Sequence, residues 1–279
     1  MTKLQPLWLF GKVPKFCRRK DVILKMNIFI HGKDARLKFC KEFLLKESKL
    51  ENREANLFLL PIPTTKDGIT INKTEETFED FIKEVRSGDI VVGYEFPKSA
   101  KVKMSCAAVY FIDVARDEKY LAENAELTAI GTLGRILTES DKAPSLLNVA
   151  VIGYGRIGQR LVRDLMFFGA RVSVFTSKKE VREDLCRLGI AGVDSLSLDA
   201  TLGGFDFSSF DLVINTAPAK LITSASTESL RSVRVIELAS GNNIPDGISY
   251  ERFSAIPAVM YPKSAAKSLK DSIMRMLGG

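Results

Sequence analysis

A glycine-rich segment after an apolar strand has the spacing of a phosphate-binding turn. It follows the residues Val149–Ile152 and consists of Gly153, Gly155, Arg156, Ile157 and Gly158 in the pattern G-x-G-x-x-G. Gly153 allows a sharp turn, Gly155 the close approach of a pyrophosphate, and Gly158 tight packing of the next helix on the strand. The start of that helix offers backbone N–H groups and a positive dipole end to phosphates. This context predicts a dinucleotide site, with a βαβ unit that binds no ligand as the alternative.

The end of the next predicted strand, Arg171–Phe175, selects the cofactor. An Asp or Glu at this point binds the ribose 2′-OH of NAD. This sequence has Thr176, Ser177 and Lys178 there instead. Ser177 and Lys178 are suited to a 2′-phosphate, so we expect NADP rather than NAD. The alternative is that Lys178 and Lys179 form only the solvated start of a helix.

A later strand of the same predicted sheet ends in small residues that suit the edge of a cofactor site. The strand is Phe210–Ile214, and the residues after it are Asn215, Thr216, Ala217 and Pro218. Small side chains let the backbone approach the cofactor, and the proline ends the strand. We expect these four residues to border the nicotinamide ribose, with an ordinary strand-end turn as the alternative.

Four residues have the chemistry to bind the carboxylates of a substrate. They are Arg36, Thr65, Lys263 and Ser264. Lys263 and Ser264 follow Pro262 at the start of the last predicted helix, where a helix N-terminus attracts anions. Arginine binds a carboxylate through two parallel hydrogen bonds, which favours Arg36 for the same role. Each residue alone is typical of a surface position, and together they predict a carboxylate site.

The scarcity of histidine limits the remaining chemistry. His31 is the one histidine of the chain, so a multi-histidine metal site is excluded and no metal is expected. His31 follows a predicted strand, where it fits either an acid/base or an ordinary loop residue, and we assign no catalytic residue. The four cysteines lack C-x-x-C spacing, which favours free thiols in the cytoplasm. No apolar run is long enough to span a membrane.

Strands and helices alternate along the chain, which is typical of parallel α/β layers. In the N-terminal half the predicted strands are 27–30, 56–60, 89–92 and 106–112, and the helices are 37–45 and 78–85. A connecting helix is predicted over 127–138. In the C-terminal half the strands are 148–152, 171–175, 210–214 and 233–238, and the helices are 156–168, 179–188 and 263–277.

The 279 residues are enough for two domains. We expect a basic extension over 1–25, a substrate domain over 26–125 plus 263–279, and a Rossmann domain over 126–262. The net charge is +7, of which +6 lies in residues 1–25, so the rest of the chain is nearly neutral. A basic arm is not a basic binding face, and nucleic acid is therefore a minor alternative that depends on residues 1–25 alone.

Several motifs taken in order resemble the family of the dipicolinate synthase A chain. They are Gly32–Arg36, Leu60–Pro61 with Thr64–Thr65, Arg116–Glu118, Gly131–Thr132, Gly153–Gly158, Asn215–Pro218, Glu237–Ser240 and Pro262–Ala265. The resemblance runs from about residue 27 to the C-terminus. It implies two α/β domains, a flavodoxin-like or Rossmann-like N-terminal layer and a doubly wound Rossmann domain, arranged as in D-2-hydroxyacid dehydrogenases.

The resemblance also implies an activity: NADP-dependent oxidation of dihydrodipicolinate, or a related small dicarboxylate, during sporulation. The partners it suggests are a homo-oligomer and a second subunit of the synthase. The sequence departs from the family pattern at Ile130, Gly241–Asn243 and Ala258–Met260. These departures motivate a second hypothesis, an NAD(P)-binding regulatory or scaffold protein that has lost catalysis.

Overall fold

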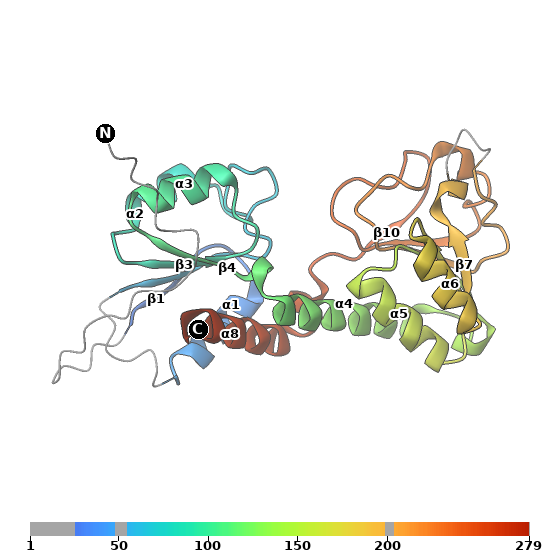
Figure 1. Cartoon of the computed structure of the whole chain (residues 1–279), viewed down its shortest axis with the longest axis horizontal. Helices are drawn as coiled ribbons and strands as arrows, with labels where there is room; N and C mark the ends of the chain where they lie inside the picture. The colour runs from blue at the N-terminus through green and yellow to red at the C-terminus, as the bar shows by residue number, and fades with distance from the viewer. Residues whose placement is uncertain (1–25, 48–54, 199–203, 279) are drawn as a thin grey trace. The chain divides into compact units, whose positions relative to one another are not determined.

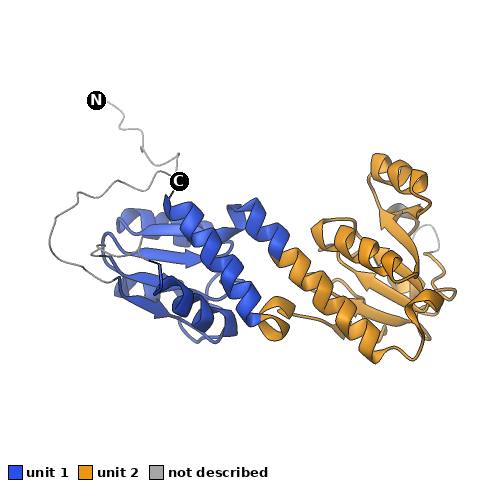
Figure 2. Cartoon of the chain, turned by 90° about the horizontal axis from the view of Figure 1, so that it is seen from below, with its two compact units in different colours: residues 1–123, 262–279 blue, residues 124–261 orange. Residues whose placement is uncertain are grey.

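The chain forms two compact units. The computed structural model describes residues 26–47, 55–198 and 204–278. Unit 1 comprises residues 1–123 and 262–279, and unit 2 comprises residues 124–261 (Figure 2). The predicted basic extension, residues 1–25, lies outside the described residues.

Unit 1 contains a four-stranded parallel sheet in the order β1-β2-β3-β4. The strands are β1 (Ile28–Ile30), β2 (Leu57–Leu59), β3 (Ile90–Gly93) and β4 (Tyr110–Asp113), and the helices between them are α1 (Ala35–Leu44), α2 (Phe78–Glu84) and α3 (Lys98–Cys106). In the flavodoxin order, 2-1-3-4-5, the first strand lies inside the sheet, whereas β1 here is an edge strand. Because the strands are parallel, the loops that follow them gather at one edge.

Helices cover both faces of this sheet (Figure 1). The last helix, α8 (Pro262–Gly278), packs beside α1 on one face, while α2 and α3 cover the other. The buried residues of α8 recur at helical spacing and enter the core of unit 1: Ala266, Leu269, Ile273 and Leu277. The end of the sequence therefore completes the first unit.

Unit 2 contains a six-stranded parallel sheet in the order β10-β9-β8-β5-β6-β7. The strands are β5 (Asn148–Ile152), β6 (Arg171–Thr176), β7 (Ala191–Asp194), β8 (Leu212–Asn215), β9 (Arg234–Glu237) and β10 (Glu251–Arg252). Numbered along the chain, this is the Rossmann order 3-2-1-4-5-6. The structure thus confirms the predicted doubly wound domain. The order reverses between β5 and β8, and ligands of such sheets bind at that point.

The two faces of this sheet are covered differently. One face packs against α5 (Arg156–Phe167), α6 (Lys179–Arg187), α7 (Ile256–Met260) and part of α4 (Glu118–Glu139). The other face is covered mostly by loops, whose phenylalanines surround Phe175 of β6. Ring centroids of Phe205 and Phe207 lie 4.9 and 5.6 Å from that of Phe175, so aromatic packing replaces helices there.

Charged side chains fix both ends of α4. At its start, Asp117 accepts hydrogen bonds from the backbone of Lys119 and Tyr120, and Arg275 of α8 pairs with the same carboxylate at 2.6 Å. At its end, Glu139 pairs with Arg234 of β9. Residues 118–123 of α4 belong to unit 1 and the remainder to unit 2, and each part is held by its own unit.

The sequence prediction was wrong over 106–112. Cys106 ends α3, and only Tyr110–Asp113 forms β4, because Ala108 has a left-handed backbone (φ 53°) that turns the chain. The helix α3 was not predicted, since its buried side chains are only Ala100 and Met104. The connecting helix begins at Glu118 instead of 127. The elements β7, β10 and α7 were also not predicted.

Candidate functional site

The glycine turn of unit 2 links β5 to α5 at the reversal point of the sheet. Gly153 has φ 93°, a left-handed conformation that glycine adopts without strain. A Cβ on Gly153 would lie 2.7 Å from Oγ1 of Thr216, and one on Gly158 would lie 2.4 Å from the carbonyl oxygen of Gly153. Backbone conformation and close packing therefore account for two of the three glycines.

Gly155 has no such explanation within the protein. Its backbone is extended (φ −81°, ψ −167°), and a Cβ placed on it would meet no atom within 4 Å. It is the N-cap residue of α5, and no side chain caps the helix there. Arg156 is exposed, whereas Ile157 is half-buried against the core. The turn thus keeps an open space in front of helix N–H groups, which fits a phosphate group.

The residues after β8 pack directly on this turn. Thr216 donates its hydroxyl to the carbonyl oxygens of Ile152 (3.0 Å) and Gly153 (3.3 Å). Ala217 is half-buried and Pro218 is exposed. Thr216, Ala217 and Pro218 therefore lie at the same sheet edge as the glycine turn, where the sequence predicts the nicotinamide ribose.

Asn215 differs from this expectation because its side chain points into the protein. It is 1% exposed, and Nδ2 donates to the two carboxylate oxygens of Glu237 at 3.1 and 3.0 Å and to the Ala217 carbonyl. Oδ1 in turn accepts the Ala217 N–H. Asn215 therefore orients the turn from behind instead of contacting a ligand.

Glu237, the last residue of β9, is fully buried beside Asn215. Besides Asn215, its carboxylate accepts the N–H of Ala239 at 2.8 Å. Burial raises the pKa of Glu237 above its ordinary value, and the hydrogen bonds from Asn215 and Ala239 offset part of the rise. The Asn215–Glu237 pair thus joins the loops that follow β8 and β9. The sequence analysis gave Glu237 no role, although an acid directly after Val235 and Ile236 in a buried strand is a usable signal.

The tip of β6 holds a hydroxyl- and cation-rich group. Thr176 is buried, and Ser177 and Lys178 are exposed. Sequence reasoning missed Arg182 of α6, whose Nη1 donates to the Thr176 carbonyl at 2.7 Å. Its spacing of four residues from Lys178 is the signal that could have identified it, since residues i and i+4 share one helix face.

In unit 1, Arg36 occupies a different place from the one predicted. It is 3% exposed, its Nε donates to Asp34 at 2.9 Å, and Nη2 donates to the Ile62 carbonyl at 3.1 Å. Asp34 also caps α1 and accepts the Ile62 N–H. Because both charges are buried and paired, Arg36 fixes the loops after β1 and β2 and does not face a substrate in this conformation.

The other predicted carboxylate ligands of unit 1 are more accessible. Thr65 is half-buried, and its hydroxyl bonds to Asp67 (3.0 Å) and Gly68 (2.9 Å) within one loop. Lys263 and Ser264 are exposed at the start of α8, and Nζ of Lys263 lies 5.5 Å from the ring centroid of Phe39 on α1. Hydrogen bonds do not join any two of the four predicted ligands within the described ranges.

His31 is half-buried and pairs with Glu76, Nδ1 to Oε2, at 3.1 Å. Its ring also packs edge-on against Phe81 at 4.8 Å between centroids. These contacts give it a structural role in the loop after β1. Across residues 26–47, 55–198 and 204–278, no group of three or more His, Cys, Asp or Glu side chains is placed to hold a metal ion. Nor do those residues contain a helix that is long and apolar enough to cross a membrane.

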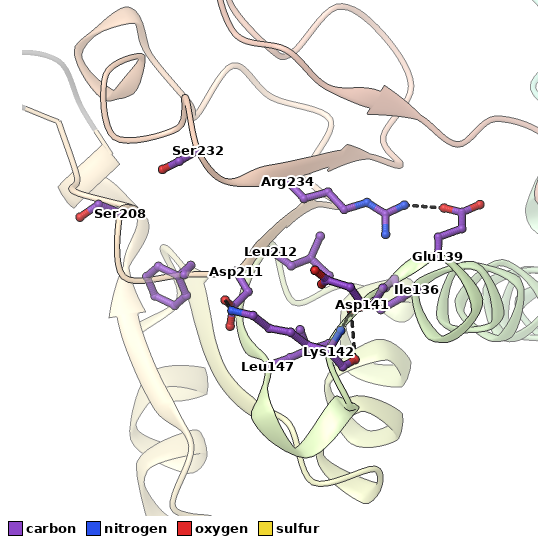
Figure 3. Close-up of a pocket in the computed structure, with 12 residues that line it drawn as sticks. Ile136, Glu139, Asp141, Lys142, Leu147, Ser208, Asp211, Leu212, Ser232 and Arg234 are labelled. Atoms are coloured by element: carbon purple, nitrogen blue, oxygen red, sulfur yellow. Dashed lines mark hydrogen bonds and ion pairs between the residues drawn. The ribbon is translucent and has the colours of Figure 1, made fainter.

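A cavity of about 360 Å³ lies at the opposite edge of the unit 2 sheet. Figure 3 shows its charged residues pointing toward one another. Lys142 pairs with Asp211 at 2.6 Å, and Arg234 pairs with Glu139. Asn148, Leu212 and Arg234 begin their strands, so this is the amino end of the sheet, away from the glycine turn. Its two basic residues, Lys142 and Arg234, each pair with an acidic residue of the lining.

The fold and the glycine turn define a two-domain α/β protein with a Rossmann domain. No family model matches the sequence, and no curated protein matches it. Solved structures do share the fold. The A chain of dipicolinate synthase from Bacillus halodurans matches with a TM-score of 0.72 at 21% identity, covering 92% of this chain and 100% of that one.

Two further solved structures share this fold. The dipicolinate synthase A chain from Bacillus subtilis matches with a TM-score of 0.70 at 17% identity, covering 92% of this chain and 97% of that one. D-lactate dehydrogenase from Escherichia coli matches with a TM-score of 0.56 at 13% identity, covering 90% and 95%. At these identities the likeness establishes the fold, which is the predicted two-domain α/β fold with parallel sheets and a doubly wound Rossmann domain.

Proposed function

We propose that this chain is an NADP-dependent oxidoreductase. The observation that carries the proposal is Gly155, a glycine that neither backbone conformation nor packing requires, placed at an uncapped helix start. A pyrophosphate supplies the reason for it, because a side chain at 155 would occupy the space of the phosphates. The position of the turn between β5 and β8 supports the same conclusion.

The residues of unit 2 divide the binding of the cofactor among them. The pyrophosphate would be held by the turn of Gly153, Gly155, Arg156, Ile157 and Gly158. The 2′-phosphate would be held by Thr176, Ser177 and Lys178. The nicotinamide ribose would lie at Asn215, Thr216, Ala217 and Pro218, with Asn215 supporting the turn from behind. The bound nicotinamide supplies hydride acceptance, and the protein positions it.

We further propose a small dicarboxylate as the substrate, with dihydrodipicolinate as the leading candidate. Its oxidation gives dipicolinate, NADPH and a proton. The resemblance of the sequence motifs and the fold shared with the dipicolinate synthase A chains support this choice. Thr65, Lys263 and Ser264 are the carboxylate ligands of this proposal, and Arg36 supports the loop that carries Thr65 through its bond to the Ile62 carbonyl. A cytoplasmic location, a homo-oligomer and a second subunit of the synthase remain part of the proposal.

Gly155→Ser tests the cofactor site. Serine is a preferred N-cap residue, so the substitution preserves helix α5, while its side chain enters the phosphate space. We expect unchanged thermal stability and NADPH affinity lowered by about tenfold or more, the equivalent of one lost charge-assisted hydrogen bond. Gly134→Ala on α4 is the control, because its nearest neighbour would lie 4.0 Å away. Full NADPH affinity in Gly155→Ser would contradict the proposal.

A turnover assay separates the two hypotheses raised by the sequence. An enzyme reduces NADP with dihydrodipicolinate or a related dicarboxylate. A regulatory or scaffold protein binds NADPH equally well and turns over none of them.

A further inference from the structure

A fixed guanidinium spans the ends of two neighbouring strands in unit 2. Arg182 donates through Nη1 to the carbonyl of Thr176, the last residue of β6, at 2.7 Å. Its Nη2 pairs with Oδ2 of Asp194, the last residue of β7, at 2.8 Å. Thr176 and Asp194 are register partners, so the guanidinium lies across the carboxyl ends of β6 and β7.

The backbone of α6 holds Arg182 in this place. Gly192 of β7 faces the helix, and a Cβ there would lie 2.9 Å from both Cα and the carbonyl oxygen of Arg182. This contact brings α6 onto the strand. The Arg182 side chain is 19% exposed, whereas Lys179 on the same helix is 77% exposed. The guanidinium is therefore positioned before any ligand arrives, which lowers the entropic cost of binding.

The tip of β6 is where a Rossmann domain distinguishes its coenzymes, since the 2′ position of the adenosine ribose faces it. An arginine fork binds a phosphate bidentately, which a lysine cannot do. Asp194 is 40% exposed and contacts the same guanidinium. A carboxylate at this point favours a ribose 2′-OH and repels a 2′-phosphate.

We propose that Arg182 and Asp194 form a coenzyme-selecting pair. Arg182 binds the 2′-phosphate of NADP(H) while it stays anchored on Thr176, and Asp194 competes with that phosphate for Nη2. The pair therefore sets the ratio of NADP to NAD affinity, with opposite contributions from its two members. This inference rests on the proposed function and names a residue that decides its cofactor.

Titration of the full chain with NADPH and with NADH tests the pair by direct binding, using calorimetry or ligand fluorescence. Arg182→Gln is expected to lower the affinity for NADPH by about tenfold or more, because a charge-assisted contact to the phosphate is lost. NADH affinity should change less than about twofold. Asp194→Asn is expected to raise the affinity for NADPH by several fold, since the carboxylate that competes with the phosphate loses its charge.

Arg187 and Asp184 supply a matched control on the same helix. They form an exposed ion pair at 2.7 Å in the C-terminal part of α6, the end of the helix away from β6. Arg187→Gln and Asp184→Asn should leave both affinities within about twofold of the original, as expected for a surface pair. Unfolding curves for all four variants show whether each remains folded.

The results distinguish this inference from the proposed function. Equal weakening of NADPH and NADH by Arg182→Gln would show a structural role and overturn the selecting pair. An unchanged or weaker NADPH affinity in Asp194→Asn would overturn the competition. If the original chain binds NADPH and Arg182→Gln binds it equally well, the inference fails while the cofactor proposal stands. If the original chain binds neither coenzyme, both fail.

Discussion

The buried Asn215–Glu237 pair allows a quantitative prediction about the loops that shape the cofactor site. In Glu237→Gln, the oxygen that receives the Ala239 N–H at 2.8 Å can be retained. The second oxygen becomes an NH2 group, which then faces Nδ2 of Asn215 at 3.0 Å, donor against donor. Turning the Asn215 amide over does not help, because Nδ2 would then face the Ala217 N–H.

The size of the effect follows from the groups left unpaired. One buried donor left without a partner costs about 1–3 kcal/mol, a figure that already includes the lost hydrogen bond. We expect Glu237→Gln to lower the unfolding free energy of unit 2 by about 2 kcal/mol. At about 2–4 °C per kcal/mol for a protein of this size, the melting temperature falls by about 4–8 °C.

Thermal and urea unfolding measure the loss, and hydrogen exchange locates it. The amides of Ala217 and Ala239 should exchange faster, because both bond to the pair. Glu228→Gln is the control, since Glu228 is 79% exposed and pairs with Arg231 on the surface. The expected change there is below about 0.5 kcal/mol.

A reciprocal exchange separates charge from geometry. Asn215→Asp alone places two carboxylates together in the core and should be the least stable variant. The double variant Asn215→Asp/Glu237→Gln restores one donor opposite one acceptor. It should therefore be more stable than Asn215→Asp by about 1–2 kcal/mol. A Glu237→Gln protein as stable as the original would refute the reasoning. It would mean that the desolvation free energy of the buried carboxylate equals the stabilisation from its hydrogen bonds.

Three further substitutions have definite expected outcomes. Gly158→Ala places a Cβ 2.4 Å from the Gly153 carbonyl oxygen. Thermal melting should show a free energy of unfolding lowered by about 1–3 kcal/mol, and titration should show that NADPH binding is lost. Burial acts to raise the pKa of Asp117, but Ser272 and Arg275 hold that pKa below its ordinary value. The pairing of Asp117 therefore stabilises the fold fully at pH values above the ordinary aspartate pKa. This stabilisation is lost as the pH falls through the lowered pKa of Asp117. Asp117→Asn should cost about 0.5–1 kcal/mol at pH 7 and nothing at the acid end, because Arg275 is 35% exposed; an equal loss at both pH values would contradict this. Burial raises the pKa of Tyr120 to about 12, and the Tyr120 hydroxyl has no hydrogen bond of normal geometry within the described residues. Tyr120→Phe should therefore change the free energy of unfolding in urea by less than about 1 kcal/mol.

The strands and the glycine turn were predictable because their signals are local. Four consecutive apolar residues before Gly153 indicate a buried parallel strand, and the spacing to Gly158 reports a packing contact between neighbours in sequence. The helix α3 was missed because its partners lie on other elements and it buries only two side chains. Short elements such as β10 depend on register with β9 and carry no periodicity of their own.

The site residues divide in the same way. The exposure of Ser177 and Lys178 agrees with their position at a strand end. The directions in which Arg36 and Asn215 point depend on buried acids: Asp34 two residues away and Glu237 on a neighbouring strand. Residue type alone gives an arginine the capacity to bind a substrate carboxylate, and only the folded chain shows that a protein carboxylate already occupies it.

The position of α8 in the sequence has a consequence for how the polypeptide matures on the ribosome. The six strands described in unit 2 have been synthesised by residue 252, whereas the core of unit 1 still lacks Leu269, Ile273 and Leu277. Domains generally acquire their structure in the order of translation. Here the amino-terminal sheet must wait, with the apolar surface beside α1 uncovered, until helix α8 emerges from the exit tunnel. Premature termination near the 3′ end of the message would therefore disable the first-made half of the protein and spare the half made later.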